Sequence, residues 1–155
     1  MNILPPPLKG EIKKARASNY TWQRVISEFI DNSNDVLVSS EQDTKNIKIT
    51  FNRDTDGNLS SISISDNYMS GIIDKSIWNW TYERGREIFD CGEFGTGFKS
   101  GSVNISSELI VYTYNISDEY IEMRAEWDEM VLENTYTPQF NDINNIKYKK
   151  FHPFD

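Results

Sequence analysis

The sequence predicts an α+β fold, a two-layer sandwich in which helices cover one face of a mixed, mainly antiparallel sheet. Three observations predict this class. Apolar residues recur at helical spacing over residues 18–38. Two pairs of segments, within 45–67 and 108–127, alternate apolar and polar residues as strands do. A glycine-rich segment, CGEFGTGFKSGS at 91–102, lies between the two pairs.

Length and composition predict one domain. The chain has 155 residues, of which 37% are hydrophobic and 13% aromatic, enough for one ordinary core. We expect this domain to span 1–155, with residues 1–10 as a flexible leader around the triple proline. No run approaches the roughly 18 apolar residues of a membrane span, and the start lacks the features of a secretory signal. We therefore expect an intracellular protein, cytoplasmic or nuclear; high Ile and Asn usage hints at a viral or phage origin.

Charge and rare residues exclude several function classes. Lys and Arg number 16 against 24 Asp and Glu, a formal charge of -8, which disfavours direct binding of nucleic acid. We expect no membrane partner either. Cys91 is the only cysteine and His152 the only histidine, so an internal disulfide, a cysteine-rich zinc site and a multi-histidine site are excluded. The composition remains compatible with the binding of a small polyanion together with a divalent cation.

The first element is a helix that begins after Ser18 or Asn19, plausible N-caps, and runs to about Val38. Within it, Glu28, Asn32 and Asp35 follow at i, i+4 and i+7 and share one face that borders the apolar face. Polar groups at such a border raise the free energy of the fold unless something binds them. A solvated helix flank is the alternative reading of this stripe.

The next two elements are strands. KNIKITFNR and LSSISISDN alternate around the turn residues DTDG, which predicts an antiparallel hairpin. Ile62, Ile64 and Asp66 share one face, so Asp66 follows the isoleucines toward the interior and needs a hydrogen-bond donor there. The exocyclic amine of a nucleobase is one candidate donor. A turn-forming Asp-Asn after the strand is the other reading.

A second hairpin is predicted from ELIVYTYN and EYIEMRAEW. Alternate residues of the latter should face the core, and the residues between them should face solvent. The predicted core side comprises Ile121, Met123, Ala125 and Trp127, and the predicted wet side comprises Glu122, Arg124 and Glu126.

The glycine-rich segment suits a phosphate ligand. Gly92, Gly95 and Gly97 allow close backbone approach, and a helix beginning near Phe98 would aim free N–H groups at the loop, with Lys99 adding a charge. Neither the dinucleotide-binding pattern, which needs a strand directly before the loop, nor the Walker pattern fits this segment.

Taken in order, EFIDNSNDV, ISDNYMSGI and GEFGTGFKSGS resemble the N, G1 and G2 boxes of the GHKL superfamily. The resemblance covers about residues 15–114, and the third box looks most like that of MORC-type and related viral or bacterial members. It implies the Bergerat fold of histidine kinase-like ATPase domains, with ATP and Mg²⁺ as ligands.

The resemblance also implies roles for individual residues. Asn32 matches the ligand of Mg²⁺, and Glu28 matches the carboxylate that activates water for attack on the γ-phosphate. Asp66 matches the acceptor of the adenine amino group, and Asp35 matches a position that supports the adenine pocket. The remaining implied nucleotide contacts are Gly71, Gly95, Thr96, Gly97, Phe98 and Lys99. Residues of about 73–94 would form the lid over the nucleotide.

Two departures from the family pattern bear on activity. The G1 box usually reads D-x-G-x-G, whereas Tyr68 stands at the first glycine position here and Gly71 comes one residue late. The threonine-containing strand that usually closes the sheet beside the adenine is not recognisable before the sequence stops at KYKKFHPFD. Either the sequence is an N-terminal piece of a longer protein, truncated before this last strand, or the site is incomplete and nucleotide binding is weak or absent.

These features predict an ATPase. The leading hypothesis is Mg²⁺-dependent ATP binding and slow hydrolysis, with lid closure acting on a partner or downstream domain and a possible homodimer on ATP binding. A catalytically inactive GHKL-fold interaction protein is the alternative. A protein kinase of the histidine type is a third reading, for which His152 is the only candidate phosphoacceptor histidine.

Overall fold

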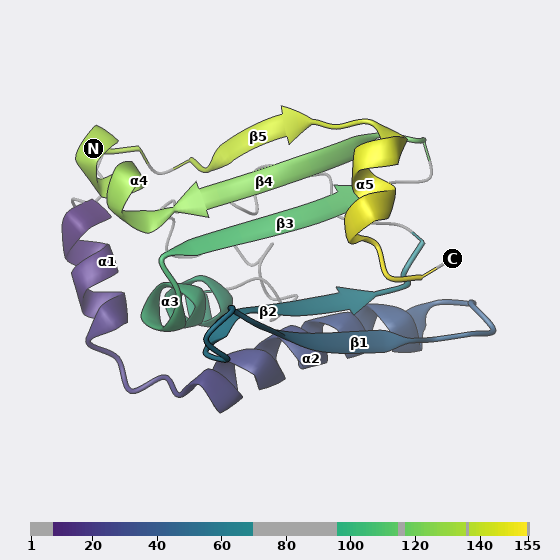
Figure 1. The fold of residues 1–155 in the computed structure, drawn as a ribbon, viewed down its shortest axis with the longest axis horizontal. Helices are drawn as coiled ribbons and strands as arrows, with labels where there is room; N and C mark the ends of the chain where they lie inside the picture. The colour runs from purple at the N-terminus through teal and green to yellow at the C-terminus, as the bar shows by residue number, and fades with distance from the viewer. Residues whose placement is uncertain (1–7, 70–95, 115–116, 136, 155) are drawn as a thin grey trace, which may run out of the picture.

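The structure is a computed structural model that describes residues 8–69, 96–114, 117–135 and 137–154. Helices and strands alternate along the chain in the order of an α+β fold (Figure 1). The elements are α1 (Leu8–Arg16), α2 (Trp22–Ser39), β1 (Ile47–Arg53), β2 (Leu59–Asp66), α3 (Thr96–Ile105), β3 (Glu108–Tyr114), β4 (Tyr120–Glu126), α4 (Trp127–Glu133), β5 (Gln139–Asp142) and α5 (Asn145–Phe151).

Helix α2 forms where the apolar spacing predicts it, but its N-cap is Thr21. The Thr21 side chain accepts a hydrogen bond from the backbone N–H of Arg24 at 3.3 Å. The proposed N-cap Ser18 instead donates through its hydroxyl to the carbonyl of Ala15, at the end of α1. The end of α1 and the start of α2 therefore lie only a few residues apart. The spacing of apolar residues alone does not show which polar residue ends α1 and which one caps α2.

Both predicted hairpins are confirmed. β1 pairs antiparallel with β2, with Ile49 opposite Ile64, and β3 pairs antiparallel with β4, with Val111 opposite Met123. β5 adds to the far side of β4. On β4 the alternation holds for the predicted core side, where Met123 and Ala125 are almost fully buried.

Helices α1, α3 and α4 enclose the main core on one face of β3 and β4. Its buried members are Leu8, Ile12, Ala15, Val103, Met123, Ala125, Trp127 and Met130. Leu8 has no exposed surface, so Leu8–Gly10, which we expected in the leader, belong to the folded domain. The Asn104 amide donates to three carbonyls at the end of α1, the shortest being that of Ser18 at 2.8 Å, and thereby fixes α1 to α3.

Helix α5 covers part of the opposite face of the sheet, which the sequence predicted to be wet. Glu122 is 4% exposed there, and its carboxylate accepts from the ammonium of Lys147 on α5 at 2.9 Å. The Tyr112 and Phe151 rings stack beside this pair with centroids 4.3 Å apart. The prediction that Glu122 faces solvent is wrong, because a helix that follows later in the chain packs on its face of the strand.

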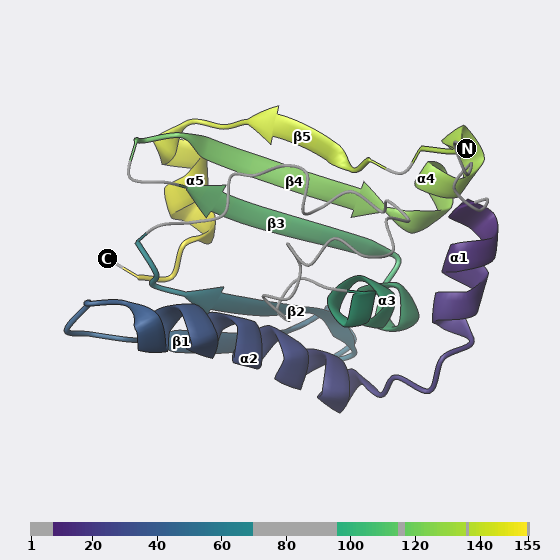
Figure 2. The ribbon, with the colours of Figure 1, turned by 180° about the vertical axis from the view of Figure 1, so that it is seen from behind.

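The α+β class is confirmed, but the described strands form two sheets instead of one. One sheet has the order β1-β2 and the other β3-β4-β5. β2 and β3 run in the same direction along the boundary between the sheets, as both views show (Figures 1 and 2). Within the described residues, no helix is both long enough and apolar enough to cross a membrane.

Candidate functional site

A hydrogen bond joins helix α2 to the end of strand β2. The Ser33 hydroxyl donates to Oδ2 of Asp66 at 2.7 Å. Ser33 is 8% exposed, and Asp66 is half-buried. The strand alternation correctly turns Asp66 toward α2, because Ile62 and Ile64 on the same face also point inward. Ser33 was missed by the sequence analysis, although its position seven residues after the buried Ile26 places it on the apolar face of the helix.

The residues after Asp66 form a turn of defined geometry. Oδ1 of Asp66 accepts the backbone N–H of Tyr68 at 3.0 Å, so the turn-forming reading of this aspartate also holds. Asn67 accepts from the backbone of Asn46 at 2.8 Å through its side-chain oxygen. Gln42 donates to the carbonyl of Asn67 and accepts from the N–H of Met69. The connection from α2 to β1 therefore holds the strand end in place.

Asn32 presents a buried amide without a partner. It is 7% exposed, and its Nδ2 makes no hydrogen bond to any part of the chain that the structure describes. An unsatisfied buried polar group destabilises a fold by about 1 to 3 kcal/mol. The position of Asn32 at the border of the apolar face of α2 predicted such a polar group in need of a partner. An amide in such a position is suited to a ligand, and rotation about its last torsion would aim the oxygen instead of the nitrogen.

Glu28 and Asp35 lie on the same stripe of α2 as Asn32 but differ in exposure. Glu28 is half-buried and lies 3.9 Å from the guanidinium of Arg24, one turn earlier. Asp35 is exposed. A carboxylate paired this loosely at the surface gains little from its partner and keeps the freedom to act on water.

Helix α3 begins at Thr96, inside the glycine-rich segment, and confirms the predicted helix. It packs closely against α2 at Gly101, where an added Cβ would lie 2.9 Å from Cγ2 of Val25. Val25 is 1% exposed and one turn before Glu28. Gly101 therefore sets the separation of the two helices, a role that the sequence analysis did not assign to it.

The structure leaves part of the predicted site undescribed. Gly71, Gly95 and the lid of about 73–94 lie outside the described residues. The backbone of Thr96, Gly97, Phe98 and Lys99 forms the first turn of α3. Such a turn carries backbone N–H groups without partners in the helix, the group expected to face a phosphate. The contacts of these four residues with a ligand stay predictions.

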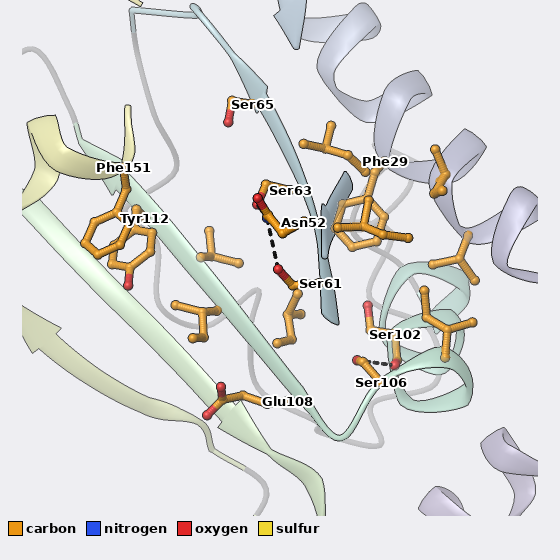
Figure 3. Close-up of a pocket in the computed structure, with 18 of the residues that line it drawn as sticks. Phe29, Asn52, Ser61, Ser63, Ser65, Ser102, Ser106, Glu108, Tyr112 and Phe151 are labelled. Carbon is orange, nitrogen blue, oxygen red and sulfur yellow. Dashed lines mark hydrogen bonds between the residues drawn. The ribbon is translucent and has the colours of Figure 1, made fainter. Parts of the chain in front are cut away.

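A cavity of about 910 Å³ runs along the boundary between the sheets (Figure 3), and Asp66 is among the residues that line it. Its lining includes Phe29 of α2, Ser102 of α3 and Ser106, which follows the end of α3. Glu28, Asn32 and Asp35 are not among its lining residues. Asp66 thus borders this cavity while bonding to α2 through Ser33.

The donor set fits a magnesium nucleotide better than a metal held by protein alone. No group of three Asp, Glu, His or Cys side chains able to hold a metal occurs in the described ranges. Mg²⁺ bound with a nucleotide needs few protein ligands, because water and phosphate oxygens supply the rest. The side-chain amide of Asn32, whose Nδ2 is buried without a partner, is compatible with that arrangement.

The α+β fold, with the first long helix fixed to the aspartate at a strand end, is that of a GHKL-type ATPase domain. The sequence model of the family described as histidine kinase-, DNA gyrase B-, and HSP90-like ATPase matches residues 20–155, and the chain belongs to this family. No curated protein and no solved structure matches the chain significantly. The particular likeness to MORC proteins stays a prediction.

Proposed function

We propose that this domain binds Mg-ATP and hydrolyses it slowly. The observation that carries the proposal is the Ser33 to Asp66 hydrogen bond, which ties the strand-end aspartate to the helix carrying Glu28 and Asn32. Family membership supports ATP binding. The proposal adds the metal, the reaction and the residue roles.

In this proposal Asp66 accepts a hydrogen bond from the adenine amino group. Each of its oxygens already accepts one bond, Oδ2 from Ser33 and Oδ1 from the N–H of Tyr68. A carboxylate oxygen has two lone-pair sites, so each keeps capacity for a further donor. The two existing bonds orient the carboxylate before the base arrives, which lowers the entropy lost on binding.

Asn32 is proposed to hold Mg²⁺ and Glu28 to take a proton from the attacking water. The Nδ2 atom of Asn32 is buried and unpartnered, and if the side-chain amide is turned over, Oδ1 takes its place as an acceptor for the ion. When bound, Mg²⁺ would neutralise charge on the phosphates. The Glu28 carboxylate lies one turn before Asn32 on the same helix, and proton removal by a positioned carboxylate contributes about 10² to 10⁴ in rate.

Asp35 and the glycine-rich segment complete the proposed site. Asp35 would support the adenine pocket from the exposed side of α2. Gly71, Gly95, Thr96, Gly97, Phe98 and Lys99 would contact the nucleotide. Lid closure, action on a partner or downstream domain, and dimerisation on ATP binding follow from the resemblance to the superfamily.

The experiment that tests the proposal combines calorimetry with phosphate release. We expect Mg-ATP to bind and phosphate to appear slowly, and both signals to fall when EDTA removes Mg²⁺. Absence of binding at millimolar ATP would contradict the proposal. It would favour the alternative, a GHKL-fold interaction protein without turnover, which Tyr68 at a glycine position of the G1 box also supports.

A further inference from the structure

The turn that follows Asp66 is held by a side chain from the connection between α2 and β1. Gln42 uses both ends of its amide for this. Its Nε2 donates to the carbonyl of Asn67 at 2.8 Å, and its Oε1 accepts the backbone N–H of Met69 at 3.0 Å. One side chain therefore takes up two backbone groups of the turn, which fixes the backbone between them.

Asn67 makes three further hydrogen bonds to the same connection. Its Nδ2 donates to the carbonyl of Thr44 at 3.0 Å, and its Oδ1 accepts the N–H of Asn46 at 2.8 Å. Its backbone N–H donates to the carbonyl of Asn46 at 3.2 Å. We call the side chains of Gln42 and Asn67 the turn clamp, because together they join the turn to the connection at both of its ends.

The turn clamp acts on the carboxylate of Asp66 through the backbone. Oδ1 of Asp66 accepts the N–H of Tyr68 at 3.0 Å, and Tyr68 lies between Asn67 and Met69, the two residues whose backbone Gln42 bonds. The other oxygen, Oδ2, accepts from Ser33 of α2 at 2.7 Å. The orientation of this carboxylate therefore depends on the helix at one oxygen and on the order of the turn at the other.

Glycine does not fix this turn. Among the residues that the structure describes, a positive φ outside glycine occurs at Asp118 and Asn134, so the backbone at 66–69 is open to any residue type. Tyr68 stands there without backbone strain. Such a backbone has several conformations available in solution, and the hydrogen bonds of the turn clamp select one of them.

We propose that Gln42 and Asn67 are positioning residues for the nucleotide base, which set the affinity and base specificity of the site by holding the turn that orients Asp66. This inference rests on the proposed function, because it needs Asp66 to accept a hydrogen bond from adenine. Ordering the turn before the base arrives removes an entropic cost from binding. Only molecules with an ordered turn bind at full affinity, so loss of the clamp weakens binding by the fraction that remains ordered.

The exposure of the connection separates this role from a purely structural one. Residues 43–46 are exposed, and Gln42 is half-buried. Water can replace a lost partner at such a site, so substitution of Gln42 should change global stability little. A clamp that served stability alone would leave the nucleotide affinity of the folded molecules unchanged.

Gln42→Ala, which removes both bonds without changing charge, is the first test. We expect calorimetry to show about tenfold weaker ATP binding. KM for ATP should rise by the same factor while kcat stays within about twofold, because Glu28 and Asn32 lie on α2, outside the turn. Amide hydrogen exchange at Met69 should become faster in the nucleotide-free variant, because this N–H loses its acceptor.

Base specificity gives a readout that a loss of stability would not move. GTP presents a carbonyl oxygen where ATP presents the amine, and a carbonyl gains nothing from an oriented carboxylate. The ratio of the GTP and ATP dissociation constants should therefore fall about tenfold in Gln42→Ala. Asn67→Ala, which removes both side-chain bonds to the connection, should change affinity and specificity in the same direction. It keeps the test decisive if Gln42→Ala fails to fold.

Gln42→Glu allows rescue by pH. The substitution replaces the donor Nε2 by an oxygen and keeps the acceptor for Met69, so ATP affinity should fall about fivefold at about pH 7.5. The facing carbonyl of Asn67 favours the protonated carboxyl and raises its pKa above the ordinary value of about 4.3. The ratio of wild-type to variant affinity should therefore return toward one near pH 5. Gln139→Glu, exposed on β5, is the matched control and should bind as the wild type does at both pH values.

Three results would overturn the proposal in a wild-type protein that binds ATP. One is wild-type ATP affinity in both alanine variants. Another is equal weakening of ATP and GTP binding, which indicates a general loss of the site. The third is a Gln42→Glu defect that is independent of pH. Absence of ATP binding by the wild type would remove the proposed function itself, and this inference with it, so the two failures are distinguishable.

Discussion

The Ser33 hydroxyl lies 2.7 Å from the Asp66 carboxylate, and this contact spans 33 residues of sequence. It fixes the helix that carries the proposed acid and amide to the strand that carries the proposed adenine acceptor. Replacing Ser33 by Ala leaves Oδ2 of Asp66 without its donor. We expect the free energy of unfolding to fall by about 1 to 2 kcal/mol in urea titration, and ATP affinity to fall with it.

Ser27→Ala is the matched control for this prediction. Ser27 lies on the same helix, is exposed, and donates to the carbonyl of Gln23. Its replacement should leave both stability and ATP affinity nearly unchanged. Equal effects of the two substitutions would indicate a general response of α2 to loss of a hydroxyl group.

Gly101→Ala should destabilise the protein by about 1 to 3 kcal/mol, because its Cβ would lie 2.9 Å from a methyl group of Val25. Gly10→Ala, in α1, has nothing within 4 Å of the added Cβ and should be neutral or stabilising. Adding Val25→Ala to Gly101→Ala should restore part of the loss, measured in a double-mutant cycle by denaturant unfolding. Purely additive effects would contradict the proposed close contact.

Lys147→Met tests how α5 is fixed to the sheet. The hydrogen bond from Lys147 lowers the pKa of Glu122 below its ordinary value of 4.5, against the opposing effect of burial. A lowered folded-state pKa stabilises the protein above the unfolded-state pKa and loses that effect as pH falls through the folded-state value. The variant should therefore be less stable than wild type by about 1 kcal/mol at pH 7.

The difference should shrink as the pH falls from the ordinary value of 4.5 through the lowered folded-state pKa of Glu122, where the folded protein takes up the proton. Lys150→Met provides the control, since Lys150 is exposed on the same helix and makes no ion pair with a described residue. Urea unfolding at both pH values measures each variant. A pH-independent difference for Lys147→Met would show that lost packing, not charge, is responsible.

Glu28→Gln should abolish phosphate release while Mg-ATP still binds, because the amide keeps the shape of the side chain but does not accept a proton. Asp31→Asn, an exposed acid on the same helix, should retain the wild-type rate. Steady-state phosphate release and calorimetry measure both properties. Unchanged turnover in Glu28→Gln would remove Glu28 from the proposed reaction.

Local patterns predicted the orientation of Asp66 and the burial of Asn32 better than they predicted the outer layers of the fold. Alternation along β2 placed Asp66 on the inward face, and the spacing on α2 placed Asn32 at a buried border. Both are properties of a single element. The covering of Glu122 by α5 depends on packing between residues 25 apart in sequence, which the alternation of β4 does not encode.

Gly101 and the division into two sheets were missed for a related reason. The sequence does not show whether a glycine in a helix faces solvent, as Gly10 does, or a second helix, as Gly101 does. Only the packing of α3 against Val25 separates the two cases. Likewise, alternating segments predict strands but not which strand edges meet. Long-range contacts decide both features.

The measurement that tests the central claim most directly is calorimetric titration of Mg-ATP into the wild type, Asp66→Asn and Asn32→Ala. We predict binding by the wild type, a loss of about tenfold or more in Asp66→Asn, and loss of the Mg²⁺ dependence in Asn32→Ala. Asp43→Asn and Asn34→Ala, both at exposed positions, should bind as the wild type does. Wild-type affinity and Mg²⁺ dependence in both site variants would contradict the proposed nucleotide site.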